Sequence, residues 1–170
     1  MNADIYWIEA VTQGRLAILG RPRSGDWMSD EIGAWKTAGL TDVVSLLEAH
    51  EVRDLDLARE ADMAAGVGLV FESFPIPDRG VPVSFEAAQA LWNRLAARIL
   101  EGHSVGVHCR AGIGRSGLIA TGVLVCLGVD ERTAWERTSK ARGRPVPDTE
   151  EQRLWLSNAY GPRRPGGSET

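Results

Sequence analysis

The segment HCRAGIGRSG, from His108 to Gly117, combines a nucleophilic side chain with a loop suited to binding an anion. It lies between an apolar strand-like run at 105–107 and an apolar helix-like run at 118–127. A loop of small residues in this place can turn its backbone N–H groups towards one point at a helix N-terminus. Unpaired donors and the helix dipole favour negative charge at that point. Cys109 lies at the base of the loop, where the same surroundings favour the thiolate, the nucleophilic form of cysteine.

Arg115 gives this loop a planar, charged fork that matches two oxygens of a phosphoryl group. One loop therefore combines a thiolate nucleophile at Cys109 with a group suited to binding phosphoryl oxygens. An isolated cysteine is usually a small buried hydrophobe, but Arg115 and three glycines in the same segment favour the reactive interpretation. The residues that we expect to contact the substrate through their backbone are Arg110, Ala111, Gly112, Ile113 and Gly114.

The spacing Cys-x5-Arg-Ser between a strand and a helix resembles the signature loop of the cysteine-dependent protein tyrosine and dual-specificity phosphatases. This resemblance implies two-step phosphoryl transfer without a metal or other cofactor, through a cysteinyl-phosphate on Cys109. It also implies that Ser116 hydrogen-bonds the departing thiolate and that His108 fixes the loop and tunes the thiol. Taken alone, Ser116 also fits a helix N-cap, and His108 fits a core histidine.

A proton donor for the leaving group is predicted at Asp78, in the segment FPIPDRGVP upstream of Cys109. Three prolines stiffen this segment and Gly80 offers a hinge, a composition typical of a mobile loop rather than a regular element. In order, spacing and local sequence, Asp78 resembles the loop aspartate that donates the proton in the phosphatase family. The alternative is an Asx-turn aspartate. Arg79 is expected to be solvated and to lie outside the site.

Three other functions share parts of this pattern. Residues 112–117 match the dinucleotide fingerprint G-x-G-x-x-G, but Arg115 adds bulk where a cofactor must approach, and the unit lies late in the chain. A rhodanese-type sulfurtransferase also uses a cysteine in an amide-lined loop, but Asp78 and the Arg115–Ser116 pair favour phosphate chemistry. A catalytically silent phosphopeptide-binding module usually lacks the cysteine, the arginine or the acid, and all three are present here.

The side chains of the loop narrow the substrate class. Phosphoinositide phosphatases of the same superfamily carry lysines where this chain has Ala111 and Ile113, so that Arg110 is the only additional charge. The resemblance therefore implies a phosphorylated protein or peptide rather than a multiply phosphorylated lipid. A Lys-Asn-Arg-Tyr-like stretch, which the family uses to recognise phosphotyrosine, is missing from the sequence. The choice between phosphotyrosine and phosphoserine or phosphothreonine stays open.

Gln152 has two interpretations. It resembles the water-positioning glutamine of tyrosine phosphatases, but the run TEEQ that begins at Thr149 also fits a capping box. In such a box the two side chains satisfy each other's backbone N–H groups at the start of a helix. We favour the capping box.

Composition and charge describe an ordinary globular protein. The 170 residues are 44% hydrophobic and 25% charged, enough for one well-packed domain and too few for two. A net charge of −4 argues against nucleic acid and anionic membranes as partners. The N-terminus lacks a signal-peptide pattern, and Cys126 is too far along its predicted helix to pair with Cys109. We expect a cytoplasmic monomer.

The alternation of strand-like and helix-like runs predicts an α/β fold with a central, mostly parallel twisted sheet of about five strands flanked by helices. The site is expected at the carboxyl end of a parallel strand, and the small size resembles compact dual-specificity or kinase-associated-type phosphatases. We expect one phosphatase domain at 1–160 and a disordered tail at 161–170. Strands are predicted at 5–8, 16–19, 42–47, 68–74 and 104–108, and helices at 29–39, 55–65, 85–99, 118–127, 130–141 and 148–160. Ser84 is predicted as the N-cap of the helix at 85–99.

Overall fold

The computed structural model describes residues 3–9 and 13–159, and the tail predicted at 161–170 lies outside these ranges. One sheet has the strand order β1-β2-β5-β3-β4. The first strand pairs antiparallel with the second, and every other pair is parallel. The predicted mostly parallel five-stranded sheet is thereby confirmed. The strands are β1 (Ile5–Ile8), β2 (Arg15–Leu19), β3 (Asp42–Ser45), β4 (Val70–Ser73) and β5 (Ser104–His108).

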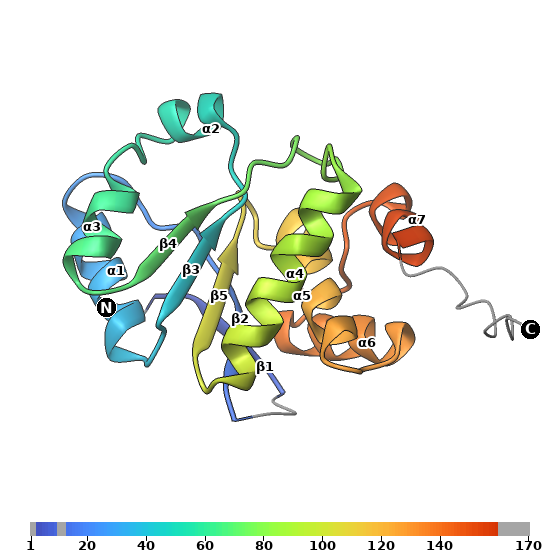
Figure 1. Cartoon of the computed structure of the whole chain (residues 1–170). Coiled ribbons are helices and arrows are strands. Elements are labelled where there is room, and N and C mark those ends of the chain that lie inside the picture. The colour runs from blue at the N-terminus through green and yellow to red at the C-terminus, as the bar shows by residue number, and fades with distance from the viewer. Residues whose placement is uncertain (1–2, 10–12, 160–170) are drawn as a thin grey trace, which may run out of the picture.

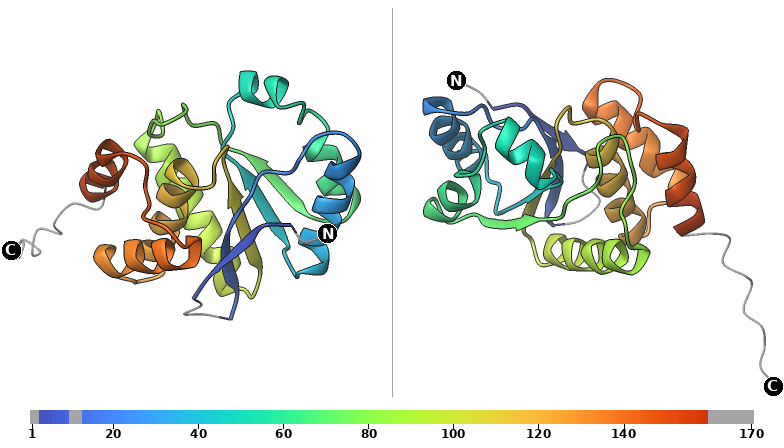
Figure 2. Two further views of the ribbon diagram at one scale, coloured as in Figure 1. Left: turned by 180° about the vertical axis from the view of Figure 1, so that it is seen from behind. Right: turned by 90° about the horizontal axis from the view of Figure 1, so that it is seen from above.

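Helices cover both faces of this sheet (Figures 1 and 2). One face carries α1 (Asp26–Thr37) and α3 (Glu60–Gly66). The opposite face carries α4, α5, α6 and α7, and the short α2 lies beyond the carboxyl ends of the strands. These helices are α2 (Ala49–Asp54), α4 (Phe85–Leu100), α5 (Gly114–Cys126), α6 (Glu131–Arg142) and α7 (Glu150–Ala159).

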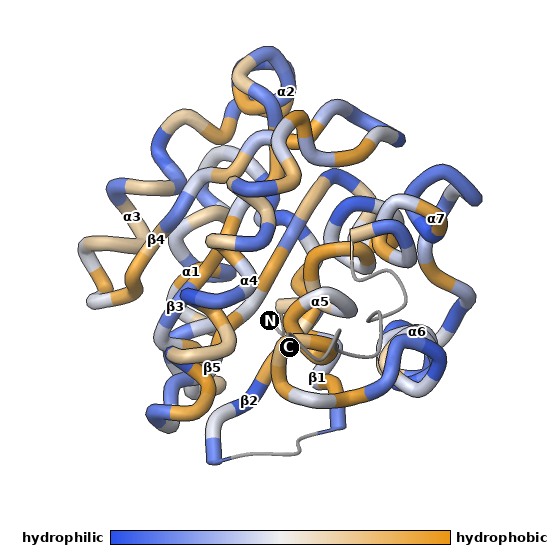
Figure 3. The backbone as a smooth tube through the Cα atoms, turned by 45° about the vertical axis from the view of Figure 1, so that its right-hand side comes forward, coloured by the Kyte–Doolittle hydropathy of each residue, from blue (hydrophilic) through white to orange (hydrophobic). Residues whose placement is uncertain are grey.

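The centre of the sheet and α5 form the interior of the molecule. All five residues of β5 are buried, and its neighbours β2 and β3 are almost completely buried. The apolar run of α5 predicted a helix without a polar face, and its residues from Gly114 to Leu124 are buried. Figure 3 shows the same contrast, because β2 and α5 are strongly hydrophobic whereas α6 is mostly hydrophilic. The strand and helix that flank the loop at 109–113 are therefore the most enclosed elements of the fold.

Several predicted boundaries are confirmed and two are wrong. Ser84 caps α4 as predicted, because its side chain accepts a hydrogen bond of 3.1 Å from the Ala87 N–H. The predicted helix at 55–65 is wrong, since α2 begins earlier and a tight turn separates it from α3. In that turn the Leu57 side chain is buried and its N–H bonds Val52 O, so apolar packing interrupts the helical pattern. The first helix begins at Asp26 rather than Ser29, after Gly25 with φ +68°.

No helix within residues 3–9 and 13–159 is long and apolar enough to span a bilayer.

Candidate active site

The loop between β5 and α5 lies at the carboxyl edge of the sheet, as the sequence predicted. A pocket of about 200 Å³ opens over it. Asp78 and the loop residues come together there, although 30 residues of chain separate them. The side chains and backbone that line this pocket belong to Asp78, Arg79, Cys109, Arg110, Ala111, Gly114, Arg115 and Asp148.

Cys109 lies at the base of the pocket, directly after β5, and only 2% of it is exposed. Its Sγ is 3.2 Å from the hydroxyl of Ser116, which is fully buried in the first turn of α5. A hydroxyl at this distance can donate a hydrogen bond to a thiolate sulfur. The geometry therefore brings Cys109 and Ser116 together in the way that the sequence predicted.

Arg115 is also 2% exposed, and a carboxylate holds its guanidinium in one orientation. Its two terminal nitrogens donate to the two oxygens of Glu51 at 2.7 and 2.8 Å, a bidentate ion pair. The same nitrogens donate to Ile76 O at 3.0 Å and to the Asp78 carboxylate at 3.1 Å. The charged fork is thus fixed before any substrate arrives.

The buried pair of Glu51 and Arg115 shifts the pKa of both groups. Burial raises the pKa of the Glu51 carboxyl, but the hydrogen bonds and charge of Arg115 outweigh it, so that the pKa is lowered overall. Burial likewise lowers the pKa of Arg115, whereas Glu51, Cys109 and Asp78 raise it, and the net change is upward. Each partner thereby keeps the other ionised.

Glu51 is the main residue of the site that sequence reasoning missed. It also forms a capping box with Glu48 at the start of α2, where its Oε2 accepts the Glu48 N–H at 2.9 Å. The spacing of these two glutamates directly after a buried strand was the available signal. A buried arginine needs a carboxylate partner, but nothing in the sequence linked Arg115 to this one.

His108 points away from the pocket, towards the face of the sheet that carries α1 and α3. Its ring is fully buried and lies 6.0 Å from the ring of Trp35 on α1. Its Nε2 is 2.5 Å from the buried carboxylate of Glu60 on α3, and its Nδ1 is 3.3 Å from Cys109 O. This contact anchors the end of β5 immediately before the cysteine, and the sequence did not indicate Glu60.

Asp78 stands at the rim of the pocket, where 54% of its side chain is exposed. A tight turn carries it, in which the Gly80 N–H donates to Pro77 O at 2.8 Å. Arg79, with φ +57°, occupies the left-handed region in this turn and lines the pocket, although we expected it outside the site. The proline-rich segment is therefore a short loop that presents a carboxylate to the phosphate-binding loop.

Neighbouring side chains and the backbone conformation require glycine at two positions of the signature loop. The G-x-G-x-x-G pattern is thereby explained without a bound dinucleotide. A Cβ on Gly114 would lie 2.8 Å from the Asp148 carboxylate and 2.9 Å from Gln152 Oε1. Gly112 has φ +69°, a conformation that favours glycine. Arg142 on α6 donates a hydrogen bond of 2.8 Å to Gly112 O and supports the loop from that side.

The five residues predicted to contact the substrate differ in their placement. Arg110 and Ala111 are exposed and line the pocket together with Gly114. Gly112 and Ile113 do not line it, and the Ile113 side chain packs into the hydrophobic core behind the loop. Neither Cys109 nor Cys126 forms a disulfide bond, and Cys126 is only partly buried.

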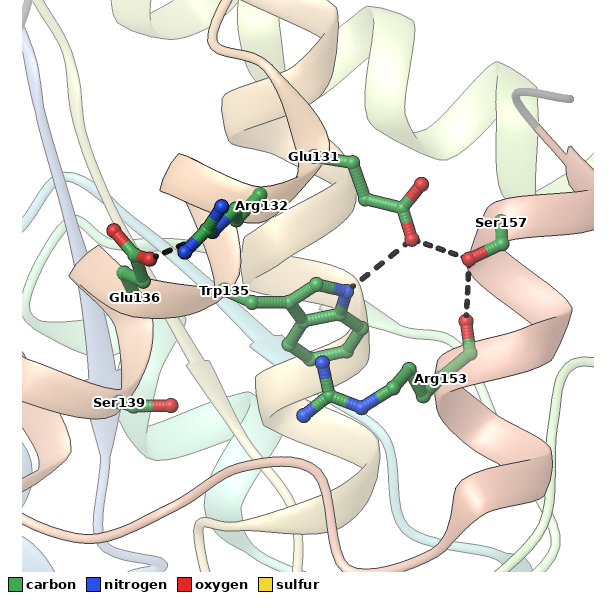
Figure 4. A pocket seen from close by; sticks show the side chains of 7 residues that line it. All are labelled: Glu131, Arg132, Trp135, Glu136, Ser139, Arg153 and Ser157. Carbon is green, nitrogen blue, oxygen red and sulfur yellow. Dashed lines mark hydrogen bonds and ion pairs between the residues drawn. The ribbon is translucent and has the colours of Figure 1, made fainter. Parts of the chain in front are cut away.

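A larger cavity of about 830 Å³ lies elsewhere, between α6 and α7 (Figure 4). Its polar groups bind one another, since Glu131 accepts hydrogen bonds from Trp135 and Ser157. It contains neither a cysteine nor a histidine. Across residues 3–9 and 13–159, no cluster of three or more His, Cys, Asp or Glu side chains could hold a metal ion. The reactive groups thus gather in the smaller pocket at the signature loop.

Comparison with known proteins agrees with this geometry. The family model described as "Polymorphic toxin system, DSP-PTPase phosphatase" matches residues 18–129. No curated protein sequence matches the chain. Kinase-associated phosphatase, solved with its catalytic-site cysteine replaced by serine, has a TM-score of 0.82 and 19% identity over 92% of this chain and 93% of its own.

Two further solved structures have the same fold. Tk-PTP in its active form has a TM-score of 0.72 and 26% identity, covering 91% of this chain and 95% of its own. PTPMT1 in complex with PI(5)P has a TM-score of 0.72 and 17% identity, covering 91% and 94%. The predicted resemblance to compact phosphatases is confirmed. The chain belongs to the DSP-PTPase phosphatase family of polymorphic toxin systems and is a cysteine-dependent phosphatase.

Proposed function

We propose that this phosphatase hydrolyses phosphotyrosine, and also phosphoserine and phosphothreonine, in proteins through a cysteinyl-phosphate on Cys109. The observation that carries the proposal is the convergence of three groups on one small pocket. The Cys109 sulfur lies at its base, the fixed guanidinium of Arg115 at its wall and the Asp78 carboxyl at its rim. These are the nucleophile, the anion-binding group and the proton donor that phosphomonoester hydrolysis needs.

In the first step the Cys109 thiolate attacks phosphorus, and the bond from phosphorus to the leaving oxygen breaks. Protonated Asp78 gives its proton to that oxygen, so that the product leaves as a neutral alcohol or phenol. Arg115 and the loop amides bind the three remaining phosphoryl oxygens as their charge redistributes. The contact between Arg115 and Asp78 supports this arrangement, because it holds the acid within reach of the bound group.

In the second step Asp78, now a carboxylate, takes a proton from water while the water oxygen attacks phosphorus. The bond between sulfur and phosphorus breaks, and inorganic phosphate is released. The Ser116 hydroxyl, 3.2 Å from the sulfur, donates a hydrogen bond to the departing thiolate. With Asp78 protonated again and Cys109 again a thiolate, the enzyme has returned to its starting protonation state.

A phosphorylated protein is favoured over a lipid by the charge around the pocket. PTPMT1 was solved in complex with PI(5)P, so a lipid phosphate is the alternative within the same fold. Arg79 and Arg110 are the cationic side chains that line this pocket beside Arg115, and Asp148 opposes them with negative charge. A multiply phosphorylated headgroup would need more positive charge than this rim supplies.

The test is hydrolysis of a panel of phosphotyrosine and phosphothreonine peptides, with PI(5)P as the lipid substrate for comparison. We expect Cys109→Ser to be inactive and Asp78→Ala to lose about two to four orders of magnitude in kcat/KM on peptides. Cys126→Ser is the matched control, because this second cysteine lies outside the pocket. Substantial turnover by Cys109→Ser would overturn the mechanism, and faster turnover of PI(5)P than of every peptide would overturn the substrate class.

We also propose that residues 1–160 act as a single phosphatase domain in a reducing compartment such as the cytoplasm. The family match ends at residue 129, yet Asp148 lines the pocket and Gln152 contacts the Asp78 loop. These contacts support an active unit that includes α7. The nucleophile must stay a reduced thiol, and the lack of a disulfide between Cys109 and Cys126 supports a reducing environment.

A further inference from the structure

Gln152, in the first turn of α7, lies where three segments of the site meet. Its side chain is fully buried. Its Nε2 donates a hydrogen bond of 3.0 Å to Gly80 O in the Asp78 loop, 72 positions earlier in the chain. A Cβ on Gly114 would lie 2.9 Å from its Oε1 and 3.0 Å from its Nε2, so the amide packs directly against the phosphate-binding loop. Figure 1 shows α7 on the same side of the molecule as the loop that leads into α4.

The two ends of this amide have different partners, which fixes its orientation. The Thr149 N–H can only donate, and it bonds Gln152 Oε1 at 3.3 Å. The Gly80 carbonyl can only accept, and it bonds Nε2. The Gln152 backbone N–H donates to the Thr149 hydroxyl at 3.1 Å, which completes the predicted capping box. The capping box therefore holds the side chain rigid while its NH₂ group points at the Asp78 loop.

The Asp78 loop is held from both ends. At its start the Ile76 N–H bonds Leu46 O at 3.1 Å, and Ile76 O accepts from Arg115. At its end the bond from Gln152 reaches Gly80, two residues beyond the aspartate. Asp78 itself is about half exposed, so packing alone does not fix its carboxyl. The Gln152 bond is a second anchor for the turn that carries the acid.

We infer that Gln152 is a positioning residue that fixes Asp78 for proton transfer to the leaving group. The inference rests on the proposed function, in which Asp78 is the general acid. In this inference the buried Gln152 amide has a role in addition to capping the helix. That role affects only the steps in which Asp78 gives or takes a proton. Loss of the Gly80 anchor lets the turn move, and a displacement of about 1 Å can cost on the order of 100-fold in rate.

The test compares two substrates that differ in their need for an acid. A phosphotyrosine peptide releases a phenolate-type oxygen that requires a proton, whereas a nitrophenyl phosphate releases a stabilised anion that does not. We compare kcat/KM, which reports only on the steps up to release of the first product, because the second step also uses Asp78 and is the same for both substrates. We expect Gln152→Met, which keeps the length and apolar bulk of the side chain, to lose about 10- to 100-fold in kcat/KM on the peptide. On the nitrophenyl phosphate we expect less than about a threefold change.

Thr149→Ala is the matched control. It removes the hydroxyl that accepts the Gln152 N–H but leaves the bond from Nε2 to Gly80 in place. We expect a lower Tm for this variant and an unchanged ratio of the two substrate rates. An equal loss of kcat/KM on both substrates for Gln152→Met would overturn the inference, because a merely structural role affects both alike.

The double variant separates this inference from the proposed function. In the Asp78→Ala background we expect Gln152→Met to cause no further loss on the peptide, since the acid that it positions is gone. Multiplicative losses would overturn the role of Gln152 and leave Asp78 as the acid. An unimpaired Asp78→Ala single variant would instead overturn the acid assignment of the proposed function, and with it this inference.

Discussion

Arg115, the residue proposed to bind the phosphoryl group, is buried and therefore needs a partner for its charge. A buried guanidinium without a partner is costly, because it loses its hydration. Glu51 compensates with two short hydrogen bonds, and it also fixes the plane of the fork. Breaking such a pair leaves an uncompensated charge in the interior. The stability of the protein and the geometry of its anion site therefore depend on the same carboxylate.

Glu51→Gln should lower the free energy of unfolding by about 3–5 kcal/mol at pH 7, the range for removing one partner of a buried ion pair. The pKa of Glu51 is lowered in the folded protein from its ordinary value of 4.5. Its contribution is therefore present above pH 4.5 and is lost as the pH falls through the lower folded value. Urea unfolding between pH 7 and pH 3 should show the difference between wild type and variant narrowing with acid.

Glu72→Gln provides the comparison for this prediction, because Glu72 forms a partly exposed ion pair with Arg94. We expect a change below about 1 kcal/mol there. A difference between wild type and Glu51→Gln that stays constant from pH 7 to pH 3 would contradict the role given to the Glu51 carboxylate.

At the scale of elements, the position of α5 decides where the phosphate-binding loop begins. This helix contacts α4, α6, α7 and the centre of the sheet. At Gly122 it lies so near α4 that a Cβ would overlap the indole of Trp92. The small residue allows the two helices to pack tightly, and the tight packing holds the first turn of α5, with Arg115 and Ser116, against the sheet.

Gly122→Ala should therefore lower the free energy of unfolding by about 1–3 kcal/mol, the usual cost of overpacking a core. Gly33→Ala is the matched control, because a Cβ on this glycine of α1 meets nothing within 4 Å. There the gain in helix propensity should stabilise the protein by up to about 1 kcal/mol. Thermal unfolding of both variants measures the two changes in stability. Equal effects of the two substitutions would contradict the packing argument.

At the scale of the whole molecule, the strand that precedes the site is deeply buried, whereas other elements of the fold are more exposed. The strand β5 pairs with β2 and β3 and is buried along its length. The edge strand β4 is partly exposed, and α2 is a short helix beyond the sheet. The proposed nucleophile, Cys109, thus follows a buried strand, whereas the proposed acid, Asp78, lies on a loop.

Native-state hydrogen exchange should reveal this difference between the buried strand β5 and the more exposed elements. Amides of β5 should exchange only through global unfolding, at a free energy of about 5–15 kcal/mol. Amides of α2 and of the turn from Pro77 to Gly80 should exchange through local opening, orders of magnitude faster. Exchange of the β5 amides as fast as those of α2 would contradict this description of the fold.

The sequence by itself determined the chemistry and most of the elements. Local patterns sufficed for Cys109 and Arg115 in one loop, for the Ser84 cap and for the buried strand before the nucleophile, because these features depend on residues a few positions apart. The order of strands and helices likewise followed from hydrophobic periodicity. The helix predicted at 55–65 failed because burial of Leu57, a tertiary contact, interrupts it.

Only the tertiary structure decided which distant groups support that chemistry. Glu51 meets Arg115 across 64 positions, Glu60 meets His108 across 48, and Gln152 meets Gly80 across 72. The chain has 23 aspartates and glutamates, and no local pattern distinguishes the two that become buried partners of the site. The physical reason is that desolvation makes a carboxylate bind a neighbouring cation strongly, and desolvation exists only once the chain has folded.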